Sequence, residues 1–474
     1  MTAAVAAARE KKSLFLWTGV VALWGIGVFA VIAYVAGQDG NWDFYNYHYY
    51  NPYAFLNDRF WFDIMPAQRQ TNIAPFLDIP FYWLTQVYGI VAASLVYAGV
   101  QAWQAPAIFA STFLLLDSRG ASHRASIATA LVLTPLAALS PLNLQLAGTT
   151  TGDSTTAVLV LWALCLFLLA QSRFVPPAGG RLRTSLFFLT GLLLGAAVGF
   201  KLTNGPFAVA LALCAFTLKE EPGIRLRVFL LICLAGTLGF LLTYGYWGWF
   251  LYSEFQNPLF PTFNQVFKSE FMKPVQLNDE TFKAETLVGV IFYPFLYNAY
   301  TGAIKYQQFF DLRIPVVYAL VVVSGVSLLF SRSVRSRLAE SPMTAGLLLF
   351  VLVSYLIWIY LFSISRYLLV LEVMTPLVAV TVAGLVFGRK WPAVAITLLA
   401  LLPVAFSTWE HTQRNNAFGY RTPWAETVFE IDFPDIDISG SMVLVTGGQA
   451  MAFLIPYGPQ DTRFVRIDSL SLIH

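Results

Sequence analysis

Long apolar runs separated by short polar segments make up most of this chain. A helix that crosses a bilayer needs about 20 predominantly apolar residues. We place predicted membrane helices at residues 14–36, 90–116, 125–141, 154–171, 184–200, 205–218, 227–246, 314–331, 343–363, 367–387 and 391–407. The pattern therefore predicts an all-α polytopic membrane protein with about 11 transmembrane helices.

The basic residues near the helix ends predict the orientation of the chain. Cytoplasmic loops of membrane proteins are enriched in Lys and Arg. With the N-terminus in the cytoplasm, every predicted inner loop is basic, and these loops contain Arg119, Arg124, Arg173, Arg181, Arg183, Lys219, Arg225, Arg227, Arg332, Arg335, Arg337, Arg389 and Lys390. An odd number of helices then places the C-terminus on the outer, extracytoplasmic face.

Two predicted outer loops are too long to be simple connections. The first covers residues 37–89, where Tyr47, Tyr50 and Phe55 recur near helical spacing. This loop is predicted to contain helices that lie at the membrane interface. The second long loop covers residues 247–313.

The last 67 residues, 408–474, read as a soluble tail. Strand-like runs at 442–446 and 463–467 flank a glycine turn and a short helix-like run. We therefore predict two parts, a transmembrane module at residues 1–407 and a small extracytoplasmic α/β tail.

Composition supports the membrane class and argues against other classes. Of the 474 residues, 57% are hydrophobic and 12% are charged, whereas soluble proteins carry about 25% charged residues. A net charge of +3 is too small to indicate a nucleic-acid partner. Cys165, Cys214 and Cys233 lie inside apolar runs without metal-type spacing, so they are predicted core residues. The first apolar run is longer than a signal peptide's core and is predicted to stay as a membrane anchor.

The richest polar chemistry directly follows the first predicted membrane helix. Residues 39–53 combine Asp39, Asp43 and His48 with seven aromatic side chains. Acidic groups at the mouth of a membrane helix are costly to desolvate and need water, a partner or a function. The aromatic rings suit the boundary between lipid and water, or the face of a sugar.

Further polar residues fall at outer helix ends. Lys201 and Arg366 are cations on the face that is usually poor in cations, and Asp153 lies between the third and fourth predicted helices. A cation at the outer membrane surface is able to hold a phosphate whose lipid tail lies in the bilayer. A nearby carboxylate is able to take the proton of an attacking hydroxyl. Together these groups predict a transferase that uses a lipid-phosphate sugar.

Each of these residues also has a purely structural interpretation. Asp39 and Asp153 are suited to cap the helices that follow them, and Asp43 fits the first turn of a helix. His48 is a possible interfacial hydrogen-bonding residue, and Lys201 and Arg366 are able to reach lipid headgroups. The remaining loop charges are predicted to pair with one another, namely Arg59 and Arg69 with Asp58, Asp63 or Asp78.

Three features of the chain resemble the GT-C superfamily of integral membrane glycosyltransferases. The first is the acidic, tyrosine-rich stretch that starts at Trp42-Asp43 and continues through Tyr47-His48 to Arg59. The second is Asp153 within Thr-Gly-Asp-Ser. The third is the run from Trp249 to Asn264, which is similar to an outer-loop motif of bacterial members. The resemblance covers residues 14–405.

The resemblance implies a GT-C-like fold and a set of residue roles. Asp43 would be the catalytic base, and Lys201, Arg366 and Tyr367 would contact the lipid phosphate. Substrate or acceptor would contact Asp39, Tyr47, His48 and Asp153. The family's common Asp-Glu or Asp-x-Asp pair is replaced here by Asp39 and Asp43, four residues apart. The identity of the base, and the use of a divalent metal, therefore stay open, and our prediction is that no cofactor or metal is needed.

The resulting hypothesis is an enzyme of the bacterial inner membrane. It would move a sugar from a polyprenyl-phosphate donor to a lipid or glycan acceptor on the extracytoplasmic face. Its partners would be these substrates and membrane lipids, without nucleic acid. The alternatives are a transporter or flippase of a lipid-linked sugar, or an O-antigen ligase or polymerase. Convergence of Asp43, Asp153, Lys201 and Arg366 at one place would favour the transferase.

Overall fold

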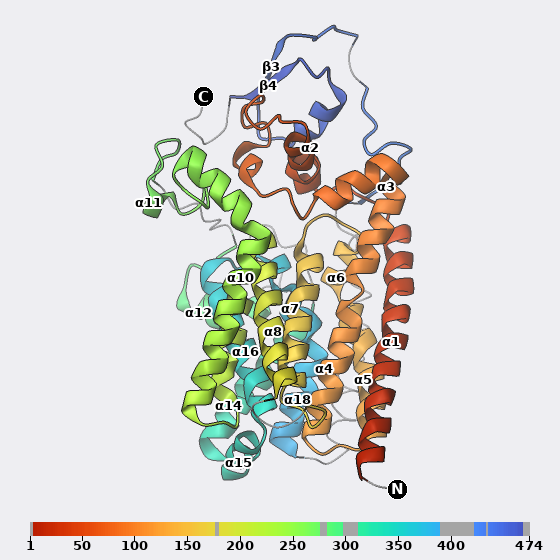
Figure 1. Ribbon diagram of the computed structural model, residues 1–474, viewed down its shortest axis with the longest axis vertical. Coiled ribbons are helices and arrows are strands. Elements are labelled where there is room, and N and C mark those ends of the chain that lie inside the picture. Colours follow the sequence, from red (N-terminus) through yellow and green to blue (C-terminus); the bar gives the residue numbers. More distant parts are fainter. Residues whose placement is uncertain are drawn as a thin grey trace.

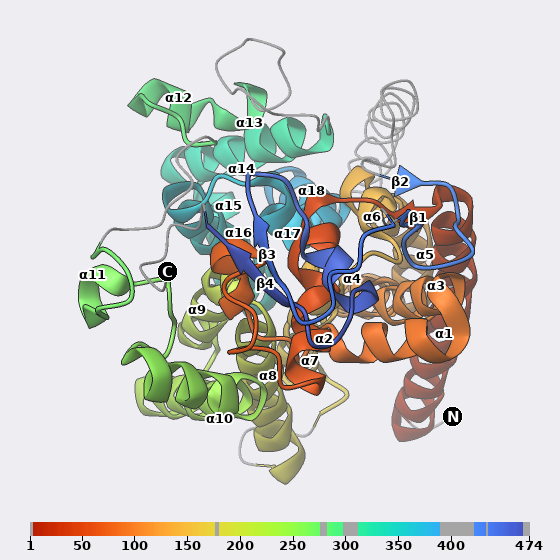
Figure 2. The same ribbon diagram turned by 90° about the horizontal axis from the view of Figure 1, so that it is seen from above.

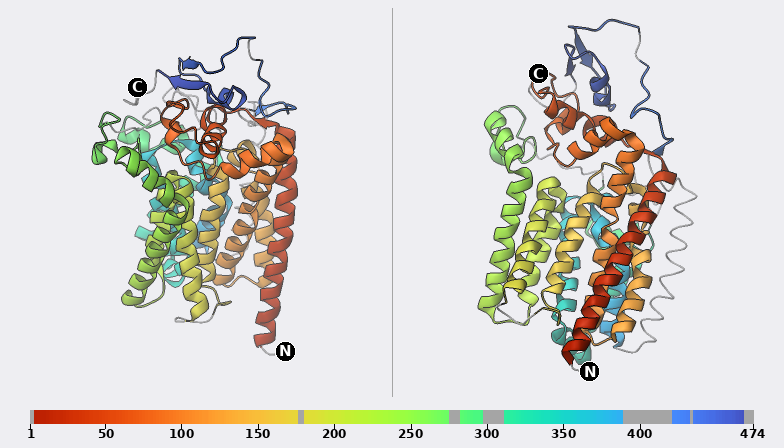
Figure 3. Two further views of the ribbon diagram at one scale, coloured as in Figure 1. Left: turned by 45° about the horizontal axis from the view of Figure 1, so that its top comes forward. Right: turned by 45° about the vertical axis from the view of Figure 1, so that its right-hand side comes forward.

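The computed structural model describes residues 3–175, 180–274, 282–296, 311–388, 421–432 and 435–467. A bundle of long helices carries a layer of short helices, loops and strands at one end (Figure 1). We call that layer, residues 37–78 and 421–467, the cap layer. The N-terminal end of α1 lies at the opposite end of the bundle (Figure 3).

The bundle is built from helices on apolar segments. They are α1 (Ala3–Ala36), α3 (Ile79–Gln101), α4 (Gln104–Ser118), α5 (His123–Ala138), α6 (Pro141–Leu146), α7 (Asp153–Leu169), α8 (Arg181–Phe200), α9 (Gly205–Leu213), α10 (Pro222–Phe255), α14 (Arg313–Phe330), α16 (Pro342–Leu361), α17 (Leu369–Val373) and α18 (Thr375–Phe387). The short helices α11 (Asn264–Phe267), α12 (Leu287–Ile291), α13 (Tyr293–Leu296) and α15 (Arg332–Glu340) lie at its periphery (Figures 1 and 2).

Within the described residues, six helical segments are long and apolar enough to cross a membrane, at 8–36, 79–118, 181–200, 222–255, 313–330 and 342–361. A seventh is the pair Ser365–Val373 and Thr375–Phe387, which is bent by 52°. These segments overlap seven of the predicted membrane helices. The predicted segments at 125–141, 154–171 and 205–218 are helical but shorter, and 391–407 lies outside the described residues. The number 11 therefore stays a prediction.

Two glycine positions shape the bundle. Gly89 has a φ of 81° and breaks α3 into two helices at a kink, at the boundary predicted between the interfacial part of the first loop and the second membrane helix. Residues other than glycine rarely adopt this positive φ. Where α8 crosses α10, a Cβ on Gly195 would lie 1.8 Å from the carbonyl oxygen of Gly236. Small residues at this crossing allow the two backbones to approach closely.

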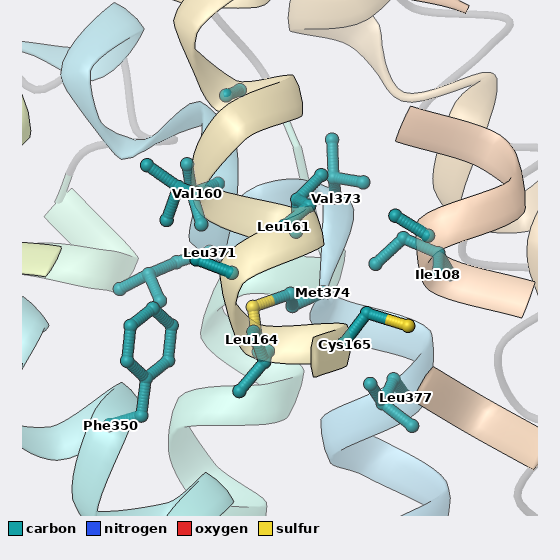
Figure 4. Close-up of a cluster of buried hydrophobic side chains, with 14 of the residues drawn as sticks. Ile108, Val160, Leu161, Leu164, Cys165, Phe350, Leu371, Val373, Met374 and Leu377 are labelled. Atoms are coloured by element: carbon teal, nitrogen blue, oxygen red, sulfur yellow. The ribbon is translucent and has the colours of Figure 1, made fainter. Parts of the chain in front are cut away.

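The core is apolar and lies where α4, α7, α16, α17 and α18 meet. Figure 4 shows Leu161 and Cys165 of α7 facing Ile108, Met374 and Leu377 from neighbouring helices. Cys165 and Cys214 are buried free thiols, which confirms the interpretation of these two as core residues. Cys233 is only half-buried.

The first loop and the tail form the cap layer together. The strands β1 (Gln38–Asp39) and β2 (Arg421–Thr422) pair antiparallel. In the tail, β3 (Met442–Val445) and β4 (Arg463–Arg466) pair parallel, and a short 3₁₀ helix over Ala452–Tyr457 lies between them. Strands and a short helix were expected at these positions. The helix α2 (Tyr50–Leu56) of the first loop lies beneath these strands (Figures 1 and 2).

Charged side chains join the tail to the first loop. Arg59 pairs with Asp63 at 2.8 Å, as predicted, and also donates to the carbonyl oxygens of Gln460 and Thr462 at 2.8 Å each. Ile64 forms a parallel bridge to Val465 of β4. The division into a module ending at residue 407 and a separate tail stays a prediction, but the described part of the tail packs on the first loop.

A buried ionic cluster lies inside the bundle. Arg313, the first residue of α14, pairs with Asp311 at 2.5 Å and with Glu372 of α17 at 3.2 Å. All three residues are almost fully buried. Glu372 also accepts a hydrogen bond from the backbone N–H of Leu142. The cluster therefore fixes the start of α14 against the bent helix pair, and it was not predicted from the sequence.

We expect Arg313→Met to lower the free energy of unfolding by about 3–5 kcal/mol, because the carboxylate of Glu372 stays buried without this cation. The measurement is unfolding of the purified protein in detergent. Arg173 offers a control, since its partly exposed side chain pairs with Asp117 and Glu10 at a bundle end. Arg173→Met should cost no more than about 1 kcal/mol. Equal losses in the two variants would contradict a special role for the buried cluster.

Candidate functional site

Four of the predicted site residues meet where the cap layer contacts the bundle. Asp43 precedes a π-helical turn, Phe44–His48, in the first loop. Asp153 is the first residue of α7, and Lys201 directly follows α8. Arg366 lies in the 3₁₀ turn Ser365–Leu368 just before α17. Segments far apart in the sequence therefore bring two acids and two cations together.

The four side chains form a chain of alternating charge. The Nη1 atom of Arg366 lies 2.6 Å from Oδ2 of Asp43, and its Nε lies 3.9 Å from Oδ2 of Asp153. The Nζ atom of Lys201 lies 2.8 Å from the same Asp153 oxygen. The side chain of Arg366 is 33% exposed and that of Asp43 is 14% exposed. Asp43 and Arg366 are thus partly accessible, as is Lys201 at 17% exposure, whereas Asp153 is buried.

An aromatic ring lies beside both cations. The ring centroid of Tyr367 is 5.5 Å from Nζ of Lys201 and 5.4 Å from Cζ of Arg366. A tyrosine face attracts cations at this distance. The three residues predicted to contact a lipid phosphate are therefore neighbours in space.

Local sequence explains how Lys201 and Asp153 are held. Gly152 has a φ of 76° and lets the loop turn into α7, with Lys201 packed 3.6 Å from where its Cβ would be. Asn204 donates to the carbonyl oxygens of Ala197 and Lys201 and to Oγ1 of Thr156. The carboxylate of Asp153 lies in the first turn of α7, where the helix dipole favours a negative charge. The turn and the helix end are therefore joined around the ion pair.

Asp39 lies apart from this chain and is fully buried. Its Oδ2 accepts hydrogen bonds from the N–H and hydroxyl of Thr150, and its Oδ1 accepts from the backbone and side-chain N–H groups of Asn41. The side chain that accepts from the N–H of Phe44, as a helix cap does, is Asn41. Asp39 thus ties the first loop to the threonine loop before α7, and the structure shows no direct contact between its carboxylate and the ion-pair chain.

His48 and Tyr47 lie beneath the surface beside Asp43. Nδ1 of His48 is 2.7 Å from Oδ2 of Asp78, and both residues are buried. The rings of Tyr47 and His48 are 4.2 Å apart. Burial raises the pKa of Asp78, with the neighbouring His48 opposing this shift. Asp78 was one of three acids predicted as partners of Arg59 and Arg69, and the structure pairs it with His48.

Electrostatics favour an ionised Asp43. Burial by itself raises the pKa of this carboxyl, but Arg366 is the main charge that opposes burial, and the pKa lies below its ordinary value. Burial also raises the pKa of Tyr47, and the negative charge of Asp43 adds to this shift. At neutral pH the site therefore contains a carboxylate next to a neutral phenol.

Metal ligands do not gather around Asp43 in the part of the chain that the structure describes. No group of three or more His, Cys, Asp or Glu side chains suited to a metal ion occurs among those residues. The other two acids predicted for the site are Asp39 and Asp153. Asp39 contacts Thr150 and Asp153 contacts Lys201 instead. Independence from a metal stays a prediction.

Solved structures identify the fold. ArnT from Cupriavidus metallidurans bound to undecaprenyl phosphate aligns with a TM-score of 0.50 and 15% identity, over 82% of this chain and 64% of that chain. The same enzyme in the apo state aligns with a TM-score of 0.46 and 15% identity, over 84% and 74% of the two chains. The oligosaccharyltransferase of Archaeoglobus fulgidus, in complex with zinc and sulfate, aligns with a TM-score of 0.46 and 13% identity, over 93% and 62%.

The likeness to the lipid-bound ArnT structure shows that this chain has the GT-C fold expected from its sequence. It spans 64% of the length of that protein. No family model matches the sequence, and no curated protein matches it. The likeness at 15% identity concerns the fold alone, and the activity of this chain is a separate question.

Proposed function

We propose that this chain is a membrane glycosyltransferase that moves a sugar from a polyprenyl-phosphate donor to a hydroxyl group of a lipid or glycan acceptor. The observation that carries the proposal is the ion-pair chain of Asp43, Arg366, Asp153 and Lys201. Two cations lie beside a carboxylate, at an accessible junction between the membrane bundle and the cap layer. The ArnT structure, which was solved with undecaprenyl phosphate, supports a donor of this chemical class.

In the proposed reaction, the carboxylate of Asp43 and the two cations of the ion-pair chain have different roles. The acceptor oxygen forms a bond to the anomeric carbon of the sugar, and its proton passes to the carboxylate of Asp43. The bond between the anomeric carbon and the phosphate oxygen breaks, and its electron pair leaves with the polyprenyl phosphate. Arg366 and Lys201 would offset the negative charge on that phosphate.

Donor binding would change the pairing of Arg366. In the structure, this guanidinium neutralises Asp43, which holds the carboxyl's pKa low and makes it a weak base. A phosphate that attracts Arg366 would take the cation away from Asp43, and the pKa of Asp43 would then rise. The base would thus become effective only when the donor is bound, which limits proton transfer in the empty enzyme.

The neighbouring side chains fit supporting roles. Tyr47 and His48 lie beside Asp43 and would orient the sugar or the acceptor, with Asp78 holding the imidazole. While no donor is bound, Asp153 would hold Lys201 and Arg366 in place. Tyr367 would position the two cations. Asp39 would act indirectly, by holding the first loop in place through its hydrogen bonds with Thr150 and Asn41. We place the protein in the bacterial inner membrane, with this site on the extracytoplasmic face and the N-terminus in the cytoplasm.

One observation favours the transporter alternative. The pair of helices at 365–373 and 375–387 is bent by 52°, and the buried Arg313–Glu372 contact lies against it. Transporters often use broken helices near buried charges. The first segment of this pair also contains Arg366, which pairs with Asp43 and which the transferase needs, so we retain transport as the second candidate.

Turnover of a lipid-linked donor distinguishes the two candidates. Purified protein in sealed proteoliposomes is given a panel of polyprenyl-phosphate sugars, and the lipids are followed by mass spectrometry. We expect polyprenyl phosphate to be released from at least one donor, with the sugar appearing on a hydroxyl acceptor or on water. Movement of intact donor across the bilayer without cleavage would contradict the transferase and support the transporter.

A further inference from the structure

A cavity of about 350 Å³ lies between the first loop and the end of α10, apart from the ion-pair chain. Seven of its eleven lining residues are aromatic, including Phe55 and Trp61 of the first loop and Tyr246 and Trp247 of α10. Pockets of about 300–1,000 Å³, mostly apolar with a few polar groups, are typical of ligand sites. Its size and its lining are thus those of a site for a small ligand.

A second cavity of about 190 Å³ lies next to the first, and Asp58 lines both of them. Its lining is more polar and includes Asn57, Arg59 and Gln460 of the tail. We call the two neighbouring cavities the trough and define it by the residues that line either of them. One part of the trough is aromatic and the other is polar, and both the first loop and the tail contribute to it.

The acceptor that a ligand reaches in both cavities is the exposed residue Asp58, which lines each of them. Asn51 lines the larger cavity, and its Nδ2 donates to the carbonyl oxygens of Gln70 and Ile73. The Oδ1 atom of Asn51 is enclosed by protein, so it is not an acceptor for a ligand. Asp58 therefore favours a ligand that brings hydrogen-bond donors.

An isoprenoid chain fits this lining poorly, because it would cover the carboxylate of Asp58 with hydrocarbon and give it no donor. A saccharide fits both kinds of wall. The C–H faces of its rings pack on aromatic side chains, and its hydroxyl groups donate to amide and carboxylate oxygens. The combination therefore favours a carbohydrate over a lipid tail.

We propose that the trough binds the saccharide part of the acceptor, several sugar units long, which rests on the proposed transferase function. Asn51 follows Asp43 by eight residues, across the π-helical turn Phe44–His48 and into the start of α2. At the α-helical rise of 1.5 Å per residue this separation along the chain is at most roughly 12 Å. A short oligosaccharide spans this distance, so its end would reach Asp43 while its preceding units occupy the trough.

The test measures binding and needs no turnover. The probe is the pool of oligosaccharides released by mild acid from the envelope of the native host. Its affinity for the full-length protein in nanodiscs is compared among wild type, Trp61→Ala and Asp58→Asn. Asn tolerates the positive φ of 53° at position 58. The control is Trp83→Ala, since Trp83 is 53% exposed, similar to Trp61 at 45%, and lies on α3 outside the trough.

We expect Kd for the oligosaccharides to rise about tenfold in both trough variants and to stay unchanged in Trp83→Ala. Binding of undecaprenyl phosphate, measured in parallel, should be the same in all four proteins. Unchanged oligosaccharide affinity in both trough variants, or no binding by wild type, would overturn the inference. Loss of undecaprenyl phosphate binding in Trp61→Ala would also overturn it and assign the cavity to the lipid tail.

The proposed function fails separately from this inference. If no donor is cleaved but the oligosaccharides still bind through Trp61 and Asp58, the trough is a carbohydrate site in a protein that is not a transferase. If a donor is cleaved while the trough variants bind and react like wild type, the transferase stands and the trough is not its acceptor site. In an active enzyme, Trp61→Ala should raise KM for the acceptor and leave KM for the donor unchanged.

Discussion

Asp43→Asn is expected to reduce sugar transfer by about 10²–10⁴-fold, the usual contribution of a general base. The amide has nearly the size of the carboxylate but does not accept a proton. Arg366 keeps Asp153 as a neighbour at 3.9 Å, so its cation is not left without a partner and the fold should persist. The measurement is the transfer rate at saturating donor, together with thermal unfolding in detergent.

The matched control for this variant is Asp437→Asn. Asp437 is an exposed acid of the cap layer that accepts a hydrogen bond from the backbone of Ser439. Its replacement should leave transfer unchanged, which separates the role of Asp43 from a general loss of acidic charge. Transfer at the wild-type rate in Asp43→Asn would exclude this residue as the base.

Arg366→Gln is expected to slow transfer by about 10²–10³-fold, because one group that stabilises the departing phosphate is lost. The variant should also change the pH profile. Arg366 is the main charge holding the pKa of Asp43 down, so its removal raises that pKa. Since Asp43 acts as a carboxylate, activity should then be lost at a higher pH as the solution is acidified. The measurement is kcat/KM across an acidic pH series.

Arg366→Lys provides the control for charge, since it keeps a cation but not the planar guanidinium. On acidification, the activity of Arg366→Lys should fall at a pH close to that of wild type. The activity of Arg366→Gln should fall at a pH further from it. We call this falling part of the pH profile the acid limb. If all three proteins show the same acid limb while the rate falls, the titrating group is not Asp43. That result would move the base elsewhere and leave Arg366 with a role in binding alone.

The sequence was sufficient for the elements that depend on local composition. Apolar runs predicted the seven segments that are long and apolar enough to cross a membrane among the described residues. The glycine at 89 lies at the predicted start of the second membrane helix. Outer helix ends were also predicted to hold Asp153, Lys201 and Arg366. These features follow from hydrophobicity and charge within a few residues, which a single sequence records directly.

Contacts between distant segments were not accessible in the same way. Asp43 and Arg366 lie 323 residues apart in the chain, and nothing in either local sequence indicates the partner. The choice of Asn41 rather than Asp39 as the acceptor for Phe44, and of His48 as the partner of Asp78, depends on backbone geometry. Glu372 carried one usable signal, an acid inside an apolar run, which in membranes points to a buried partner.

The antiparallel pairing of Gln38 with Thr422 has a consequence for biogenesis. A ribosome completes the first loop early, but it makes the strand that pairs with this loop 384 residues later. Until then the loop that carries Asp43 lacks its cover, and closing so large a loop costs chain entropy. A nascent chain halted before residue 421 would insert its helices but lack this partner strand. The pairing beside the first loop is therefore completed only after residues 421 and 422 have been made, which would withhold the proposed transfer from chains that have not reached them.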